Sequence, residues 1–479
     1  MTLSYSLLAF SIALSSPLFA NTVEQSTTIN DQSAVAVTIY NKNLALIKDQ
    51  RNITLNKGLN HLSFRGVSAQ IRPETALLRS LDTNNYLHVL EQNFDFDLLT
   101  PQKLLEKFTG KQIRYSSINP VTGIETIEPA TVLSTHGGTT LKLADRIITN
   151  PQGSFIFDQV PSNLRDQPTL VTQVTSSSNQ AQTIELGYLT GGLSWKADYV
   201  AELNNNDTHL NLTGWITLNN QSGTHYNNAK LQLVAGDVNQ VQDRLLQRQS
   251  PRLETMAFKS SAVNDVSEES LFEYHLYNLA RTTNLSNNQT KQVSLLSVNT
   301  VPVKKEFVLQ GQNYYYNSRY GQLSKKIKIG VFVEFNNNEQ AQLGMPLPKG
   351  IVRVYKNDSQ GNAQFVGEDN IDHTPKNEDI RLKLGDAFDI TANRNQTDFK
   401  KAKYRPPHHS AYESAYEIEL KNAKPEAVTV TIREPIPGEW KIIKENHPHN
   451  KAASNMAEWS VTIPAESSTT LNYRVLVQH

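Results

Sequence analysis

The stretch GGLSWKADYVAELNNNDTHLNLTGWITLNNQSGTHYNNAKLQLVAGDV, from Gly191 to Val238, decides the fold class of the chain. Its apolar residues recur at every second position, which is the period of a strand with one buried face. Runs of Asn, Asp, Ser and Gly at 204–207 and 219–223 separate three such segments and are typical of turns. The stretch therefore predicts three strands joined as an antiparallel meander.

Two tryptophans of this stretch are predicted to point to opposite faces of the sheet. Trp195 is in phase with the apolar Tyr199, so we expect it in the core. Trp215 lies between Thr213 and Thr217, out of phase with the apolar positions, and is expected on the polar face. Either another segment of the chain covers that face, which we favour, or the indole is offered to a partner or a sugar ring.

The composition is that of a chain with several folded domains and no excess charge. Its 479 residues suffice for roughly two to four domains. Lysine plus arginine and aspartate plus glutamate both number 46, so no net field favours nucleic acid. The sequence has no cysteine, which excludes disulfides, thiol nucleophiles, cysteine zinc sites and a lipid-anchor cysteine.

The first twenty residues have the pattern of a signal peptide. Leu3 to Phe19 is the one long apolar segment, Pro17 breaks it near its end, and Ala20 is a small residue before the expected cleavage site. The segment is too short and too rich in serine for a stable membrane span. We therefore expect export, with Asn21 as the first mature residue, to the periplasm or the medium. No transmembrane segment is expected after signal removal.

The remaining chain is predicted to form an N-terminal β region over 21–180 and a C-terminal β domain over 181–479. The segment from Thr100 to Gly110 predicts a helix, because Thr100 can cap it, Pro101 fits its first position and Gly110 can end it. Short strands after it suggest a small barrel near 100–157. Residues 240–264 lack periodicity and are expected to form a disordered excursion. Strands spaced along 390–479 favour an immunoglobulin-like sandwich.

Several separated motifs, in the same order along the chain, carry a resemblance to a known family. They are WKADY (195–199), NNQSG (219–223), LQLVAGDV (231–238), PLPKGIVRVYKNDSQGNAQFVGEDNI (346–371), LKLGDAFDI (382–390) and EWSVTIPAESSTTLNYRV (458–475). Over roughly residues 186–479 the chain resembles a bacterial family known only as a domain of unknown function, number forty-one thirty-nine, which includes mucoidy inhibitor A-like proteins. The resemblance supports the fold class, but it implies no established activity, catalytic residue or ligand.

Two histidine clusters are the first candidate for chemistry. His408 and His409, together with His447 and His449, lie in loops of the same predicted sandwich and could converge on zinc, copper or nickel. No acidic residue nearby in sequence completes a recognised metal site, and prolines mark both places as exposed loops. Surface histidines are therefore the favoured interpretation, and we predict no metal site.

Acidic residues at strand ends are the second candidate. The run from Glu368 to Asp372 could hold a cation, but it lacks the spacing of an EF-hand loop and reads better as a solvated turn. Asp237, Asp386 and Asp389 could act as paired carboxylates in glycoside hydrolysis. Hydrogen bonding of aspartate to nearby backbone explains all three more simply. No catalytic residue is therefore assigned.

The sequence as a whole predicts an all-β, mainly antiparallel protein of several sandwich-like lobes. No P-loop, Gly-x-Gly-x-x-Gly, Gly-x-Ser-x-Gly or His-Glu-x-x-His motif is present, and no cofactor is expected. We favour a non-catalytic cell-envelope role in binding, adhesion or assembly, with an envelope protein or polysaccharide as partner. A hydrolase of envelope polysaccharide or peptide and a weak metal-binding protein are the alternatives. The aromatic run from Tyr314 to Tyr316 is a further candidate contact surface.

Overall fold

The computed structural model describes residues 24–161, 163–236, 238–239, 266–271, 274–404 and 408–479. Of the described residues, 63% are in strands and 4% are helical, and most strand pairs are antiparallel, so the predicted all-β class is confirmed. The predicted signal peptide, Asp237 and the predicted excursion at 240–264 lie outside the described residues. The domain boundary predicted at residue 181 stays a prediction.

The chain divides into two compact units. Unit 1 comprises 1–37, 45–192 and 221–229, and unit 2 comprises 38–44, 193–220 and 230–479, as far as these ranges are described. In unit 1 one sheet has the order β1 (Gln25–Thr27), β4 (Gly58–Arg65), β12 (Thr169–Ser176) and β6 (Leu87–Asp95). A second series pairs β2 (Gln32–Tyr40), β3 (Leu44–Thr54), β13 (Ala181–Thr190) and β5 (Leu77–Ser80), and two 3-10 turns (η1, Ile29–Asp31; η2, Pro73–Thr75) connect these elements.

The core of unit 1 contains a buried arginine. Arg51 is fully buried, and its Nη2 lies 2.8 Å from Oδ2 of Asp49. Its Nη1 donates to the backbone oxygen of Thr27 at 3.0 Å, and its guanidinium lies 3.8 Å from the centre of the Phe64 ring. Carboxylate, carbonyl and ring together compensate the burial of this charge.

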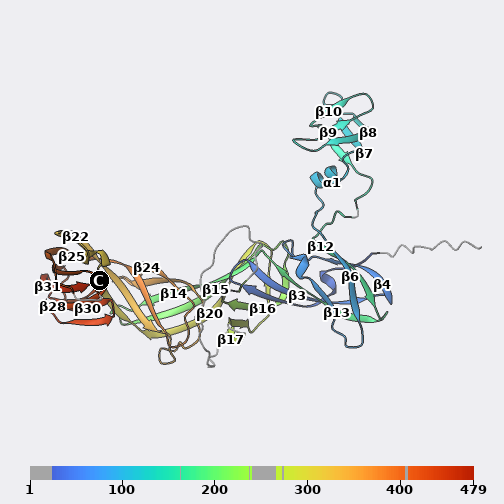
Figure 1. Ribbon diagram of the computed structural model, residues 1–479. Helices are drawn as coiled ribbons and strands as arrows, with labels where there is room; N and C mark the ends of the chain where they lie inside the picture. Colours follow the sequence, from blue (N-terminus) through green and yellow to red (C-terminus); the bar gives the residue numbers. More distant parts are fainter. Residues whose placement is uncertain (1–23, 162, 237, 240–265, 272–273, 405–407) are drawn as a thin grey trace, which may run out of the picture. The chain divides into compact units, whose positions relative to one another are not determined.

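The predicted helix is confirmed as α1 (Pro101–Lys107). The side chain of Thr100 accepts the backbone N–H of Lys103 at 3.1 Å, and Gly110 follows with a φ of 79°. Strands β7 (Gln112–Ile118), β8 (Glu125–Ser134), β9 (Thr140–Lys142), β10 (Ile147–Thr149) and β11 (Ser154–Ile156) form a sheet in the order β10-β9-β8-β7-β11 (Figure 1). Leu105 and Phe108 pack into the core of this sheet.

A five-stranded sheet in unit 2 contains the first two strands of the 191–238 stretch. Its order is β20 (Gln289–Pro302), β15 (His209–Asn220), β14 (Leu193–Leu203), β23 (Gly350–Asn357) and β24 (Ala363–Ile371). The β14–β15 hairpin is as predicted, but the predicted meander is wrong in its third strand. The second neighbour of β15 is β20, and β14 pairs in parallel with β23.

The third predicted strand, β16 (Tyr226–Ala235), belongs to a different sheet. It pairs with β18 (Tyr274–Leu279) and β19 (Thr283–Leu285), and β18 pairs in turn with β17 (Val266–Leu271). Alternation tells which residues of a strand are buried, but it does not tell which neighbour the strand takes. The physical reason for the wrong prediction is therefore that β16 buries the same face in either arrangement.

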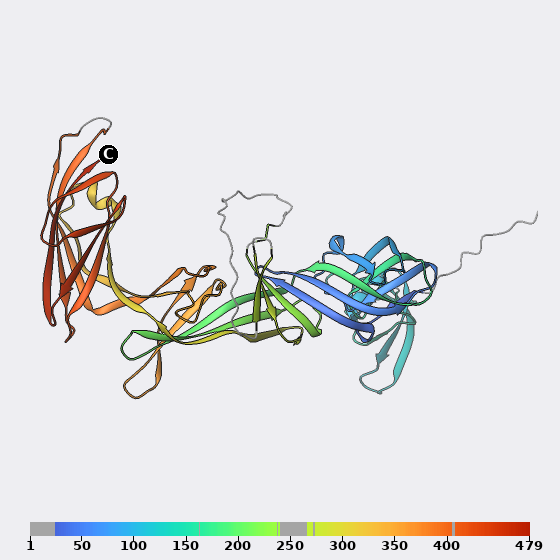
Figure 2. The same ribbon diagram turned by 90° about the horizontal axis from the view of Figure 1, so that it is seen from below.

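The C-terminal part of unit 2 is a nine-stranded sheet with the order β28-β31-β26-β25-β22-β21-β27-β30-β29. These strands are β21 (Lys304–Gln310), β22 (Gln322–Asn336), β25 (Asp379–Lys401), β26 (Ala411–Asn422), β27 (Val428–Pro435), β28 (Glu439–Glu445), β29 (His449–Ala453), β30 (Met456–Ile463) and β31 (Ser467–Gln478), with a 3-10 turn η3 (Asn313–Tyr316). The sheet curls over itself (Figure 2). Strands from both halves of the order share one core, as in a sandwich.

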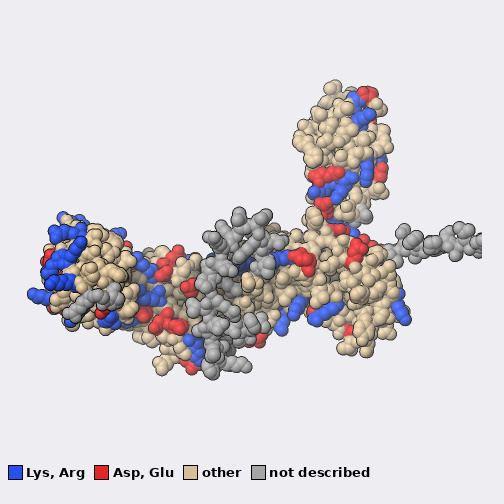
Figure 3. Space-filling model, in the orientation of Figure 1, with Lys and Arg blue, Asp and Glu red and all other residues tan. Residues whose placement is uncertain are grey.

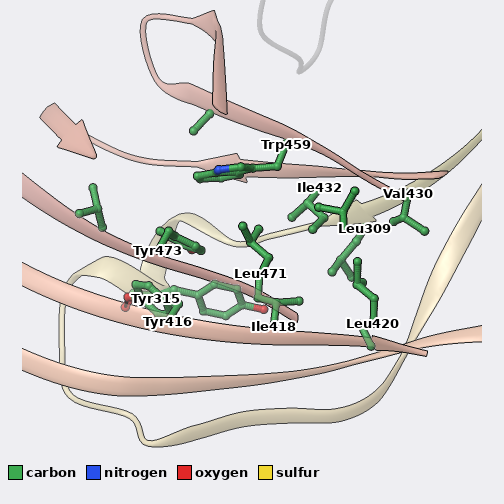
Figure 4. Packing of buried hydrophobic residues seen from close by; sticks show 14 of the residues in the cluster. Leu309, Tyr315, Tyr416, Ile418, Leu420, Val430, Ile432, Trp459, Leu471 and Tyr473 are labelled. Atoms are coloured by element: carbon green, nitrogen blue, oxygen red, sulfur yellow. Dashed lines mark hydrogen bonds between the residues drawn. The ribbon is translucent and has the colours of Figure 1, made fainter. Parts of the chain in front are cut away.

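The core of this sandwich contains a group of packed aromatic rings among its aliphatic side chains. Figure 4 shows Leu309, Val430 and Leu420 grouped apart from Trp459 and the tyrosines. The rings of Trp459 and Tyr473 stack with centres 4.7 Å apart, and those of Tyr416 and Tyr473 with centres 5.1 Å apart. Stacked aromatic pairs of this kind add to the stability that burial of their area provides.

Candidate functional site

The polar face of the five-stranded sheet is the candidate site. Successive side chains of a strand point to opposite faces, and residues paired across strands share a face. Asp198 of β14 is paired with Trp215 of β15, which is paired with Ser294 of β20. The opposite face is buried. There, Trp195 is 3% exposed, its Nε1 donates to the backbone oxygen of Val234 at 3.3 Å, and its predicted core position is confirmed.

A row of polar side chains joined by hydrogen bonds and one ion pair crosses all five strands on this face, and we call it the polar ladder. Its members are Gln292 (β20), Thr217 (β15), Asp198 (β14), Arg353 (β23) and Glu368 (β24). Gln292 Nε2 donates to Thr217 Oγ1 at 3.1 Å, and Thr217 Oγ1 donates to Asp198 Oδ2 at 2.7 Å. Arg353 reaches Asp198 Oδ1 with Nη1 at 3.1 Å and Glu368 Oε2 with Nε at 3.2 Å.

Asp198 is the central acceptor of the polar ladder. Its side chain is 10% exposed and also receives Lys196 Nζ at 3.1 Å. Burial raises the pKa of this carboxyl, but the hydrogen bonds from Thr217, Arg353 and Lys196 outweigh it and hold the pKa below its usual value. The ladder therefore keeps a fixed negative charge in the middle of the face, with cationic groups on either side of it.

Trp215 lies beside the ladder and is open to solvent. It keeps 37% of its surface exposed. The favoured expectation that another segment covers this residue is therefore wrong for the part of the chain that the structure describes. Farther along the same face, Tyr355 and Phe365 meet edge to face with ring centres 5.7 Å apart, and Phe365 is 55% exposed. The face thus offers aromatic rings beside ordered donors and acceptors.

The candidate histidines do not converge. His408 contacts Glu439 at 2.9 Å, where β28 begins, whereas His449 contacts Glu445 at 3.0 Å, where β28 ends. The seven residues of this strand hold the two histidines roughly 20 Å apart. Within the described ranges, no group of three or more His, Asp or Glu side chains could hold a metal ion.

The candidate carboxylates are dispersed, and most of them are ordinary surface groups. Asp389 is exposed, and Asp386 lies 3.5 Å from Lys383. The run from Glu368 to Asp372 belongs mainly to β24 and not to a turn, so the expected solvated turn is wrong there. Asp369 accepts the backbone N–H of Lys383 at 2.7 Å. Because this run is mostly acidic and polar, its sequence does not show the alternation of apolar and polar residues that predicts a strand.

Among the described residues, Glu434 is the one carboxyl whose pKa is raised. Its burial outweighs the attraction of Arg394, and no part of the side chain is exposed. A general acid in glycoside hydrolysis needs a raised pKa and contact with substrate. Glu434 has the first property without the second, so the hydrolase alternative gains no support from it.

The aromatic run from Tyr314 to Tyr316 is divided between surface and core. Tyr314 is 48% exposed and meets Tyr315 edge to face at 4.8 Å, whereas Tyr316 is fully buried. The hydroxyl of Tyr316 donates to Glu434 at 2.8 Å. This run therefore helps to build the sandwich, and it leaves one ring on the surface.

The even charge balance of the chain hides a local excess of cations. In the view of Figure 3, lysine and arginine side chains gather on the C-terminal sandwich. Exposed lysines of its strands and of the loop that follows β25 include Lys325, Lys326, Lys328, Lys400, Lys401 and Lys403. Net charge alone could not reveal this distribution.

A comparison with protein families shows to which family the chain belongs. The model of a domain of unknown function, DUF4139, matches residues 184–479, which is more than half of the sequence. The chain belongs to this family. The matched DUF4139 segment contains all five strands of the polar ladder, so the candidate face lies wholly within it. Among curated proteins no match is found. No helix in the described ranges is long and apolar enough to cross a membrane.

Proposed function

We propose that this DUF4139 protein is an exported, non-catalytic binding module of the cell envelope, and that the polar face of its five-stranded sheet binds a glycan chain. The observation that carries the proposal is the exposed indole of Trp215 beside the polar ladder. A sugar ring presents C–H groups to an aromatic face and hydroxyls to hydrogen-bonding groups at its edge. The candidate face provides both kinds of partner.

The ladder is suited to recognising hydroxyl groups because its polar atoms are ordered before a ligand arrives. Arg353 is held between Asp198 and Glu368, so its remaining N–H groups keep fixed directions. Side chains already held in place lose little conformational entropy on binding. Neighbouring strands repeat these groups at about 4.8 Å, which distributes donors and acceptors across the width of the sheet.

The test is binding of envelope polysaccharide fragments to the full chain, followed by tryptophan fluorescence and calorimetry. Trp215→Ala and Arg353→Met should each weaken binding about tenfold or more, and Trp215→Ala should change the unfolding midpoint little. Tyr86→Ala is the matched control, because Tyr86 is an aromatic residue that is 77% exposed and lies in unit 1. Equal binding by all three variants would remove the sheet face from the proposal.

A protein partner is the other outcome of this test. If no glycan fragment binds, but Trp215→Ala abolishes association with a purified envelope protein, the face is an assembly surface and the glycan proposal fails. An exposed indole is enriched in protein interfaces as well, so the same variant reports on both.

The export part of the proposal rests on the apolar segment that ends at Ala20. Protein recovered from the native cell should begin near Asn21 when its N-terminus is sequenced. Recovery only of material that begins at Met1, from the cytoplasm, would contradict export.

A further inference from the structure

A hollow in unit 2, distinct from the polar face, has the features of a small-ligand site. It has a volume of about 200 Å³, and its lining residues include Asp207, Lys305, Val333, Lys356, Val366 and Asp386. These residues come from the β14–β15 hairpin and from β21, β22, β23, β24 and β25. Its lining is mostly apolar with a few charged groups, which is the usual composition of a ligand pocket.

Two ammonium groups at this hollow are spaced for a carboxylate. Lys305 Nζ lies 2.8 Å from Oδ2 of Asp207, and Lys356 Nζ lies 2.5 Å from Oδ1 of the same side chain. One carboxylate therefore already bridges the pair. An ammonium has three N–H donors, so each lysine retains donors for a second carboxylate. Two lysines and one aspartate leave this end of the hollow with one excess positive charge.

Asp207 is held as a permanent part of this arrangement. Burial raises the pKa of its carboxyl, but hydrogen bonds from Lys305 and Lys356 outweigh the burial and keep the pKa below its usual value. The residue sits in the turn between β14 and β15 with a φ of 58°. The ammonium pair is thus positioned by a fixed anion before any ligand binds.

The rest of the hollow fits a branched aliphatic group and an N–H donor. Leu203, Val333 and Val366 all line the hollow; Leu203 and Val333 are buried at 7% and 1% exposed, and Val366 is 39% exposed. Asp386 also lines the hollow, and its nearest cation, Lys383, is 3.5 Å away. Its carboxylate can therefore accept a further hydrogen bond from a ligand.

We propose that this hollow binds an aliphatic amino acid through its carboxylate, as the free acid or as the last residue of a peptide. The carboxylate lies on Lys305 and Lys356, the side chain lies against Val333 and its apolar neighbours, and the α-nitrogen donates to Asp386. Capture of a terminal carboxylate is a known mode of peptide recognition. Lys356 also lines a neighbouring hollow of about 410 Å³ formed with residues 205, 357–359 and 361, which leaves room for preceding residues.

Calorimetric titration of the full chain tests the carboxylate requirement and separates the two sources. The probes are leucine, N-acetyl-leucine, Gly-Gly-Leu and N-acetyl-leucine amide. The three acids should bind at least about tenfold tighter than the amide, because only they offer a carboxylate to the ammonium pair. Tighter binding of Gly-Gly-Leu than of leucine identifies a peptide end as the ligand, and the reverse order identifies the free acid.

Variants of residues that line the hollow test whether the acids bind there. Lys356→Met and Lys305→Met should each weaken the binding of N-acetyl-leucine at least about tenfold. Val366→Trp should weaken it as much, because the larger side chain fills the hollow. Lys421→Met is the control, because Lys421 is an exposed lysine paired with Glu419 elsewhere in unit 2. Equal affinity for acid and amide, unchanged binding by Val366→Trp, or no binding of any acid at roughly 10 mM would overturn the proposal. Neither glycan binding nor its loss bears on this result, because Trp215 does not line the hollow.

Discussion

Arg394 and Glu434 form an ion pair in which both side chains are completely buried in the C-terminal sandwich. Glu434 also accepts the hydroxyl of Tyr316 at 2.8 Å, and the guanidinium of Arg394 lies 4.7 Å from the centre of the Tyr315 ring. The pair joins β25 to β27 through the core. Both side chains are closed off from solvent, so the pair acts on the stability of the sandwich.

Replacing one residue of this pair should lower the free energy of unfolding more than replacing both. Arg394→Met and Glu434→Leu should each lower the free energy of unfolding by about 3–5 kcal/mol, since each leaves a buried charged partner without compensation. The double variant should be more stable than either single variant, because two apolar side chains then pack together. Urea unfolding of the three variants measures this, and additive losses would show that the two residues are not coupled.

The two tryptophans of β14 and β15 should respond in opposite ways to truncation. Trp195→Ala should cost about 3–5 kcal/mol, because it empties a large buried site. Trp215→Ala should change the free energy of unfolding by less than about 1 kcal/mol, because the indole is already partly in solvent. A soluble quencher should reach Trp215 and spare Trp195. Strong quenching of Trp195 would show that the register of β14 is wrong.

Stability should fall in acid partly through Asp198. Its folded-state pKa lies below the usual value of 3.8, so its carboxylate contributes stability above that pH. This contribution is lost as the pH falls below about 4 and through the folded-state pKa. Asp198→Asn should lower the free energy of unfolding by about 1.5–3 kcal/mol at pH 7 and flatten the acid limb. Asp389→Asn, at an exposed site, is the control.

Replacement of Gly350, where β23 begins, is predicted to destabilise the fold. A Cβ at this position would lie 2.2 Å from the backbone oxygen of Ala197, so Gly350→Ala must push β23 away from β14. We expect a loss of about 1–3 kcal/mol. At Gly187 the nearest atom to an added Cβ is 3.9 Å away, and Gly187→Ala should cost less than about 0.5 kcal/mol. Thermal unfolding of the two variants makes the comparison, and equal midpoints would argue against the close β14–β23 approach.

Local pattern predicted the strands but not their partners. The alternation around Trp195 and Trp215 placed each indole on its correct face, and the capping signals at Thr100 and Gly110 located α1. The polar ladder could not be predicted in this way. Thr217 and Gln292 are 75 residues apart, and Asp198 and Arg353 are 155 residues apart. Pairing over such separations is set by how whole sheets bury area, which no short window of sequence contains.

The lysines that line the small-ligand hollow could not be predicted from the sequence for the same reason. Lys305, Lys356 and Asp207 belong to three different elements, and each alone is an ordinary charged residue in or beside a strand. Only the folding of the five-stranded and nine-stranded sheets brings them to one place. The candidates that sequence did suggest were clusters along the chain, namely the histidines and the acidic runs, and these are dispersed in space.

The parallel pairing of β14 with β23 can form only after most of the chain has been synthesised. A growing chain that has just completed β15 can form the β14–β15 hairpin, but the other edge of β14 stays unpaired until Gly350 and the rest of β23 have been made. An open strand edge readily recruits other chains. Truncated products that end before Gly350 should therefore aggregate in cells.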